Sequence, residues 1–144
     1  MSKIFFLMLV AFTAALPARA AIQLEPGLWQ DTETGLQDGK PAKPEVSTDC
    51  LSAEEARAPV KTILKDTEGQ QCETLNVKEN GNTVAVEMKC GDPKKTWIGI
   101  DMTINFLSAR HYNGAIKSLV LFGGQKVTSE KTIDSKWIAA SCKK

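Results

Sequence analysis

The sequence predicts a mainly β fold: an antiparallel meander or partly closed small barrel with one short helical segment, stapled by disulfides. Apolar and polar residues alternate with a period of two from Ile98 to Phe106, which is typical of a half-buried strand. Asn80-Gly81 and Gly123-Gly124 separate apolar runs, as the tight turns of hairpins do. Four cysteines in a chain of 144 residues favour two disulfide bonds. Short strands and close turns together indicate a small antiparallel sheet.

The first twenty residues have the parts of a secretory signal peptide. Lys3 supplies the positive charge, Ile4 to Leu16 the apolar segment, and Ala18-Arg19-Ala20 the small-x-small cleavage motif. The apolar segment is shorter than the ~20 residues of a membrane-spanning helix. We therefore expect cleavage after Ala20. Residues 21–144 should then form a single soluble β domain with no membrane span.

The charge of the exported chain excludes some partners. The full sequence has 18 Lys and Arg and 17 Asp and Glu. Removal of Lys3 and Arg19 takes two from the 18 and leaves 16 basic residues against 17 acidic ones, a net charge of −1. A nearly neutral chain with mixed signs lacks the basic surface that nucleic acid requires, so we expect no nucleic-acid partner.

The first half of the domain should contain two strands followed by the helical segment. The strands are expected at Gly27 to Leu36, with Trp29 buried, and at Val46 to Cys50. Ser52 is suited to the N-cap of the helix and Glu55 to its third position, a capping box. Pro59 falls inside the segment, so the helix is either kinked or split into two short pieces.

The hairpin between Cys72 and Cys90 constrains the disulfides. A two-residue turn at Asn80-Gly81 sets Val77 opposite Val84. When this register is continued along the hairpin, the side chains of Cys72 and Cys90 point to opposite faces. Side chains on opposite faces cannot form a disulfide, which disfavours this pair unless a bulge intervenes.

Of the remaining connectivities, we expect Cys50–Cys72 and Cys90–Cys142. The first would clip the helical segment to the sheet, and the second would staple the C-terminal strand. A metal site is the alternative use of the cysteines. The chain has no C-x-x-C pair and its only histidine, His111, is remote from all four, so we expect neither a metal nor a cofactor.

The second half should be a run of strands. Trp97 to Leu107 leads through a turn at residues 111–114 into a strand from Ala115 to Phe122. The Gly123-Gly124 hairpin sets Val120 opposite Val127 and Lys117 opposite Glu130. Three further features complete the expected order: a strand at Lys126 to Ile133, a turn at Asp134-Ser135, and a last strand at Trp137 to Cys142.

The two ends of the domain resemble a family of exported bacterial proteins known as DUF3617. The opening Pro26-Gly27-Leu28-Trp29 is similar to that family, and so is the closing strand from Lys136-Trp137-Ile138 to Cys142. The intervening cysteines, the Asn-Gly hairpin and the Tyr112-Asn113-Gly114 turn add to the resemblance. It covers residues 21–144, implies a Gram-negative periplasmic setting, and implies no chemistry, because no function is established for the family.

The sequence contains no recognisable catalytic motif. His111 lies in the expected turn, and no Gly-x-Ser-x-Gly elbow accompanies it. The best candidates for a binding site are the three tryptophans, Trp29, Trp97 and Trp137, although such aromatics also serve as core packing. Two hypotheses follow. The favoured one is a periplasmic binding or interaction module without catalytic activity, whose partner is a small apolar ligand or another periplasmic protein. The alternative is a small hydrolase with an unrecognised site.

Overall fold

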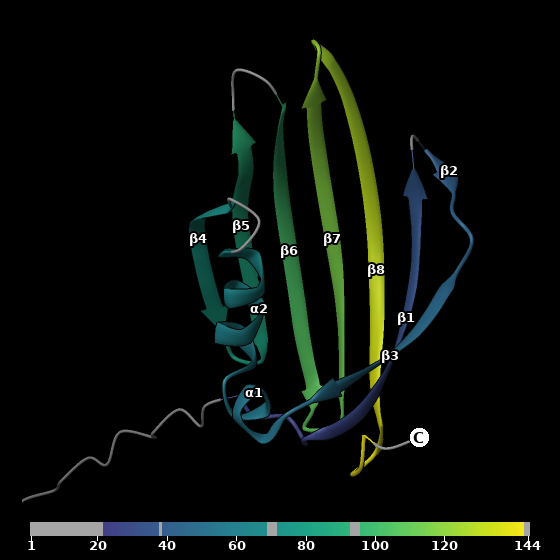
Figure 1. Ribbon diagram of the computed structural model, residues 1–144, viewed down its shortest axis with the longest axis vertical. Helices are drawn as coiled ribbons and strands as arrows, with labels where there is room; N and C mark the ends of the chain where they lie inside the picture. The colour runs from purple at the N-terminus through teal and green to yellow at the C-terminus, as the bar shows by residue number, and fades with distance from the viewer. Residues whose placement is uncertain (1–21, 38, 69–71, 93–95, 143–144) are drawn as a thin grey trace, which may run out of the picture.

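The protein is mostly β, with an open sheet and two short helices, in a computed structural model that describes residues 22–37, 39–68, 72–92 and 96–142 (Figure 1). The expected signal peptide, residues 1–20, lies outside the described residues. The strands and helices, in chain order, are β1 (Gly27–Gln37), β2 (Lys40–Pro41), β3 (Glu45–Leu51), α1 (Ala53–Arg57), α2 (Pro59–Glu68), β4 (Cys72–Asn80), β5 (Thr83–Asp92), β6 (Thr96–Ser108), β7 (His111–Phe122) and β8 (Gln125–Ala139).

The eight strands form one antiparallel sheet in the order β2-β1-β8-β7-β6-β5-β4, with β3 also paired to β1. Strands β4 to β8 are a simple meander, as expected. The first strand, β1, pairs with the last, β8, and the sheet does not close into a barrel. In Figure 1, β3 crosses the lower end of the sheet on the side that carries the helices.

The predicted register of the β7–β8 hairpin is confirmed. Gly123 and Gly124 have positive φ values and form the turn, and Val120 lies opposite Val127. The Nζ of Lys117 is 3.6 Å from a carboxylate oxygen of Glu130, and both side chains are exposed. The pair therefore contributes little to stability.

Two turns expected from composition are strand in the structure. Residues 111–114 open β7, and the reversal before them falls at residues 109 and 110. Asp134 and Ser135 lie within β8, which runs unbroken to Ala139. Both segments pair with neighbours: Asp134 is opposite Asn113 on one side and Thr32 on the other. Ladder pairing on two sides overrides the local turn preference of Asp and Ser.

The helical segment is split in two, one of the two forms expected. Glu55 accepts a hydrogen bond from the backbone of Ser52 at 2.8 Å and donates its own N–H to the Ser52 hydroxyl, which confirms the capping box. Pro59 is the first residue of α2, the position where its missing N–H costs nothing. Within the described part of the chain, neither helix is long and apolar enough to cross a membrane.

The core lies between the helices and one face of the sheet, here called the inner face. Alternation along β5 sends Val84, Val86 and Met88 to this face, where they are almost fully buried. β6 adds Ile104 and Phe106, and β1 adds Trp29. The face on the other side of the sheet, the outer face, carries no helix in Figure 1.

The predicted disulfide pairing is wrong: the bonds are Cys50–Cys142 and Cys72–Cys90. In the β4–β5 hairpin Asn80 pairs with Thr83, so the loop is Gly81-Asn82 rather than Asn80-Gly81. Val77 then lies opposite Val86, and this register alone would set residue 73 opposite Cys90. A bulge at residue 75 shifts the pairing by one and brings Cys72 opposite Cys90.

The second bond follows from the position of β1 between β3 and β8. Leu28 of β1 is paired with Cys50 on one side and with Ala139 on the other. Cys142 follows Ala139 by three residues, and its Cα lies 5.6 Å from that of Cys50. The bond therefore ties β3 to the C-terminal end of the chain. The sequence had predicted Cys90, not Cys50, as the partner of Cys142.

Candidate functional site

A cavity of about 140 Å³ lies between α2 and the inner face of the sheet. Eight of its eleven lining residues are apolar or aromatic, and the polar ones are two aspartates and a threonine. The lining residues are Leu24, Trp29, Asp31, Asp49, Leu51, Pro59, Thr62, Ile63, Ile104, Phe106 and Tyr112.

The strand periodicity of β1 and the register of its neighbours build the polar side of this cavity. Trp29 and Asp31 are two residues apart and so share the inner face. Asp31 lies opposite Ser135 of β8, and Ser135 lies opposite Tyr112 of β7. Asp49 of β3 is opposite Trp29. Four strands, β1, β3, β7 and β8, thus carry the carboxylates and the hydroxyls to one place.

Aromatic rings form much of the cavity wall. Trp29 is 3% exposed, and its indole N–H donates to the backbone oxygen of Glu25 at 2.9 Å. The ring centroid of Tyr112 is 5.5 Å from that of Trp29 and 5.9 Å from that of Phe106, with tilted planes. These contacts fix the rings, so the wall is largely preformed.

The carboxyl group of Asp31 is in an unfavourable place for a charge. Burial raises its pKa above the ordinary value; the nearby Ser135 hydroxyl is the next largest influence and lowers it, and the charges of Asp49 and Glu33 raise it further. Asp31 Oδ1 and Ser135 Oγ are both buried without a hydrogen bond of acceptable geometry to the described residues. Burial also raises the pKa of Tyr112, so its hydroxyl stays protonated at neutral pH.

Asp31→Asn should raise the melting temperature at pH 7 and leave it unchanged near pH 3. The pKa of Asp31 is higher in the folded than in the unfolded state, so the folded state binds the proton more tightly. Its ionisation therefore destabilises the fold as the pH rises above about 4, and the effect is absent below both pKa values. Thermal unfolding of both proteins across this pH range measures the difference.

Glu33→Gln is the matched control for that measurement. Glu33 shares the strand and face of Asp31 but accepts from Lys131 Nζ at 3.0 Å. Loss of this exposed pair should lower stability by about 0.5 kcal/mol or less at pH 7. If Asp31→Asn lowers the melting temperature at pH 7 as well, the account of Asp31 as a destabilising charge is wrong.

The structure brings only one of the three candidate tryptophans to the cavity. Trp29 lines it. Trp137 is paired with Trp29 in register but is not a lining residue; its indole N–H donates to the Pro26 carbonyl at 3.0 Å, and Arg110 lies 4.5 Å from its ring centroid. These contacts give Trp137 a packing role.

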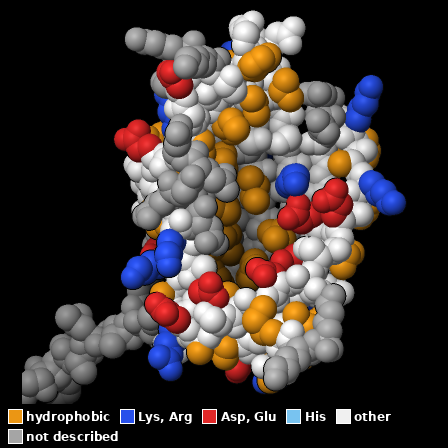
Figure 2. All heavy atoms as spheres, in the orientation of Figure 1, with side chains coloured by type: hydrophobic (Ala, Val, Ile, Leu, Met, Phe, Trp, Pro, Cys, Tyr) orange, Lys and Arg blue, Asp and Glu red, His pale blue; other side chains and the backbone are white. Residues whose placement is uncertain are grey.

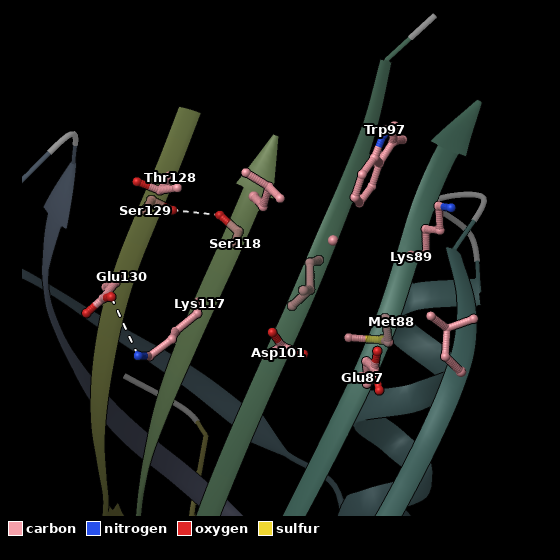
Figure 3. A pocket seen from close by; sticks show the side chains of 14 residues that line it. Glu87, Met88, Lys89, Trp97, Asp101, Lys117, Ser118, Thr128, Ser129 and Glu130 are labelled. Carbon is pink, nitrogen blue, oxygen red and sulfur yellow. Dashed lines mark hydrogen bonds and ion pairs between the residues drawn. The ribbon is translucent and has the colours of Figure 1, made fainter. Parts of the chain in front are cut away.

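Trp97 lies at a different place altogether, on the outer face near the start of β6. It lines a shallow groove of about 480 Å³, in which its ring covers Gly99 and Lys89 Nζ stands 4.9 Å from the ring centroid. Figure 3 shows this groove, with Trp97 along β6 and the Lys117–Glu130 ion pair on β7 and β8. The expectation that the tryptophans form one site is not met by the fold.

His111 is in β7, and Asp134 is in the neighbouring strand, β8. The Nε2 of His111 is 2.6 Å from Asp134 Oδ1, and Lys136 Nζ is 2.6 Å from the other carboxylate oxygen, Oδ2. The hydrogen bond from His111, with that from Lys136, lowers the pKa of Asp134. The Asp134 carboxylate is thus paired with Lys136 and hydrogen-bonded to His111.

Sequence reasoning missed Asp31, Asp49 and Tyr112, although a signal for Asp31 was present. Once Trp29 is predicted to be buried in a strand, alternation places the residue two positions later on the same buried face. An aspartate at that position is a polar residue assigned to the core, which marks a functional candidate. Tyr112 had been assigned to a turn, and Asp49 depends on a strand pairing that the sequence does not reveal.

A family model described as "Protein of unknown function (DUF3617)" matches residues 24–142 of the chain. The match spans every helix and strand of the described fold. No curated protein and no solved structure matches the chain.

Proposed function

Because the chain belongs to the DUF3617 family, for which no function is established, we propose its function from the cavity: it is a binding module for a small, largely apolar ligand. The observation that carries the proposal is the preformed space of about 140 Å³ between α2 and the sheet, walled by aromatic and aliphatic side chains. Concave, mostly apolar sites with a few placed polar groups are typical of ligand binding. A mostly apolar wall supports binding over hydrolysis.

The surface around the cavity supports the same proposal. Figure 2 shows the face that carries the helices as hollowed, with hydrophobic side chains inside the hollow and acidic side chains at its edge. Residues further along the inner face, among them Ile100 and Met102, are only partly buried and pack against the core. The apolar lining thus continues beyond the cavity, which gives a ligand a route of entry.

We place this activity in the periplasm of a Gram-negative bacterium, after removal of residues 1–20. The support is the pattern of the leader and the two disulfides, which form in oxidising compartments.

Toluene is the probe that tests the proposed binding site. An engineered apolar cavity of about 150 Å³ holds benzene, so a space of this size suits one aromatic ring. Titration of the exported protein with toluene should shift the methyl NMR signals of Ile63 and Ile104, which line the cavity, in a saturable way. The methyl signals of Leu119, in the outer groove, should not move.

Variants at Ile63 make the result specific to the cavity. Ile63→Trp fills the space and should abolish the saturable shifts, whereas Ile63→Ala enlarges it and should retain binding. Leu119→Trp is the control on the outer face and should bind toluene as the unmodified protein does. Circular dichroism establishes that each variant is folded. Absence of saturable shifts in both the unmodified protein and Ile63→Ala would rule out the cavity as a binding site.

A further inference from the structure

The cavity has a one-sided charge. Asp31 and Asp49 are the only charged residues among those that line it, and neither forms an ion pair within the described part of the chain. The neighbouring Glu33 differs, because Lys131 neutralises it at 3.0 Å. No cation within the described part of the chain compensates the two cavity carboxylates.

Hydrogen-bonding capacity is left over at the same place. Asp31 Oδ1 is buried in the cavity wall and accepts no hydrogen bond from the described residues. Ser135, opposite Asp31 in register, is completely buried; its hydroxyl lies close enough to Asp31 and Tyr112 to lower the pKa of both, yet it forms no well-aligned hydrogen bond with the described residues. A buried polar atom that lacks a hydrogen bond destabilises the fold, so a ligand group that donates to Asp31 is favoured here. Asp49 lies at the exposed edge, where one of its carboxylate oxygens accepts from the backbone N–H of Cys50 at 2.8 Å.

The aromatic wall of the cavity favours a positively charged ligand, as the carboxylates do. Trp29, Tyr112 and Phe106 surround the space beside Asp31, with neighbouring ring centroids 5.5 and 5.9 Å apart. The faces of aromatic rings attract cations, and aromatic cages are a recurring means of binding ammonium groups. Negative carboxylates, unsatisfied acceptor capacity and ring faces all point to a positively charged group.

We propose that the cavity binds an organic cation, in which a protonated amine donates to Asp31 and a small apolar body packs against Trp29 and Tyr112. This inference rests on the proposed binding function and names the class of its ligand. The volume of about 140 Å³ limits the enclosed part to about one aromatic ring with its aminomethyl group. The ammonium compensates the partly buried carboxylate of Asp31, which explains why a destabilising charge lies in the cavity wall.

The binding should depend on pH in a defined way. An ammonium pairs with the ionised form of Asp31, whose pKa lies above the ordinary value. Affinity therefore rises as the pH increases through that pKa, stays constant near neutrality, and falls when the amine loses its proton at about pH 10. A neutral ligand of the same shape should show no such rise.

Three aromatic probes of matched size test the proposal: benzylamine, benzyl alcohol and benzoate. Isothermal titration and methyl NMR of the exported protein at pH 7 should show benzylamine binding at least tenfold more tightly than benzyl alcohol, and benzoate not binding. Asp31→Asn should weaken benzylamine binding at least tenfold and leave benzyl alcohol unchanged. Glu33→Gln, a residue outside the cavity wall, should change neither by more than about threefold.

The outcomes separate this inference from the proposed function. Equal affinity for benzylamine and benzyl alcohol, or tight benzylamine binding that survives Asp31→Asn, overturns the cation proposal and leaves the apolar binding site intact. Failure of all the probes, toluene included, overturns both. Displacement of benzylamine by calcium chloride at constant ionic strength would show that the carboxylates hold a metal ion, and it also counts against the proposal.

Discussion

Replacement of both Cys50 and Cys142 by alanine should lower the free energy of unfolding by about 4–5 kcal/mol. The bond joins residues 92 positions apart, and a disulfide that closes a long loop removes much conformational entropy from the unfolded chain. The loss is comparable to the whole stability of many domains, so this variant should be largely unfolded at 37 °C. Urea denaturation followed by circular dichroism measures the change.

The other bond supplies the matched control. Cys72 and Cys90 are separated by 18 residues, so the same model gives about 3 kcal/mol for their replacement by alanine. Single replacement of Cys142 by serine should leave Cys50 as the new free thiol, which peptide mapping identifies. A free thiol at Cys90 in that variant would instead restore the pairing that the sequence suggested.

Trp29→Ala should lower the free energy of unfolding by about 3–5 kcal/mol. Trp29 is 3% exposed, packs against Tyr112 and donates a hydrogen bond to the Glu25 carbonyl, so truncation leaves a large void beside an unpaired acceptor. The same variant enlarges the cavity and removes one face of its aromatic wall. Chemical denaturation followed by far-ultraviolet circular dichroism provides the measurement.

Trp97→Ala is the control for this measurement. It shows how much stability is lost when an aromatic ring outside the core is removed. Trp97 is half-buried on the outer face, where its ring contacts Gly99 and Lys89. Its truncation should cost about 1 kcal/mol. Similar losses for the two variants would mean that the inner and outer faces contribute equally to the core, contrary to the fold described above.

Most of the fold was predictable because its signals are local. The alternation in β6 and the Gly123-Gly124 turn fix strand type and register within one hairpin, and the capping box at Ser52 fixes the start of α1. The failures occur where distant pairing overrides local preference. Asp134-Ser135 has turn composition but lies between β1 and β7, and both neighbours hold it in a strand.

The disulfide error has a similar origin. One extra residue at Leu75 reverses which face of β4 carries Cys72, and Leu75 itself is exposed, so no apolar pattern marks the bulge. The site was less accessible than the fold, because the cavity depends on β1 pairing with β8. No local sequence pattern predicts the pairing of β1 with β8. Of the cavity residues that the sequence analysis missed, only Asp31 was predictable, because alternation places it on the same face of β1 as Trp29.

The Cys72–Cys90 bond lies inside the loop that Cys50–Cys142 closes, so the cysteines are synthesised in an order that differs from their pairing. The ribosome delivers Cys50 first, then Cys72 and Cys90, and Cys142 only near the end. Cys50 lies in β3, which pairs with β1, and β1 gains its second long neighbour, β8, only when synthesis is almost complete. Pairing of consecutive cysteines in order of arrival would join Cys50 to Cys72 and trap a wrong isomer. Delayed oxidation, or an isomerase that reshuffles early bonds, would prevent this isomer from persisting.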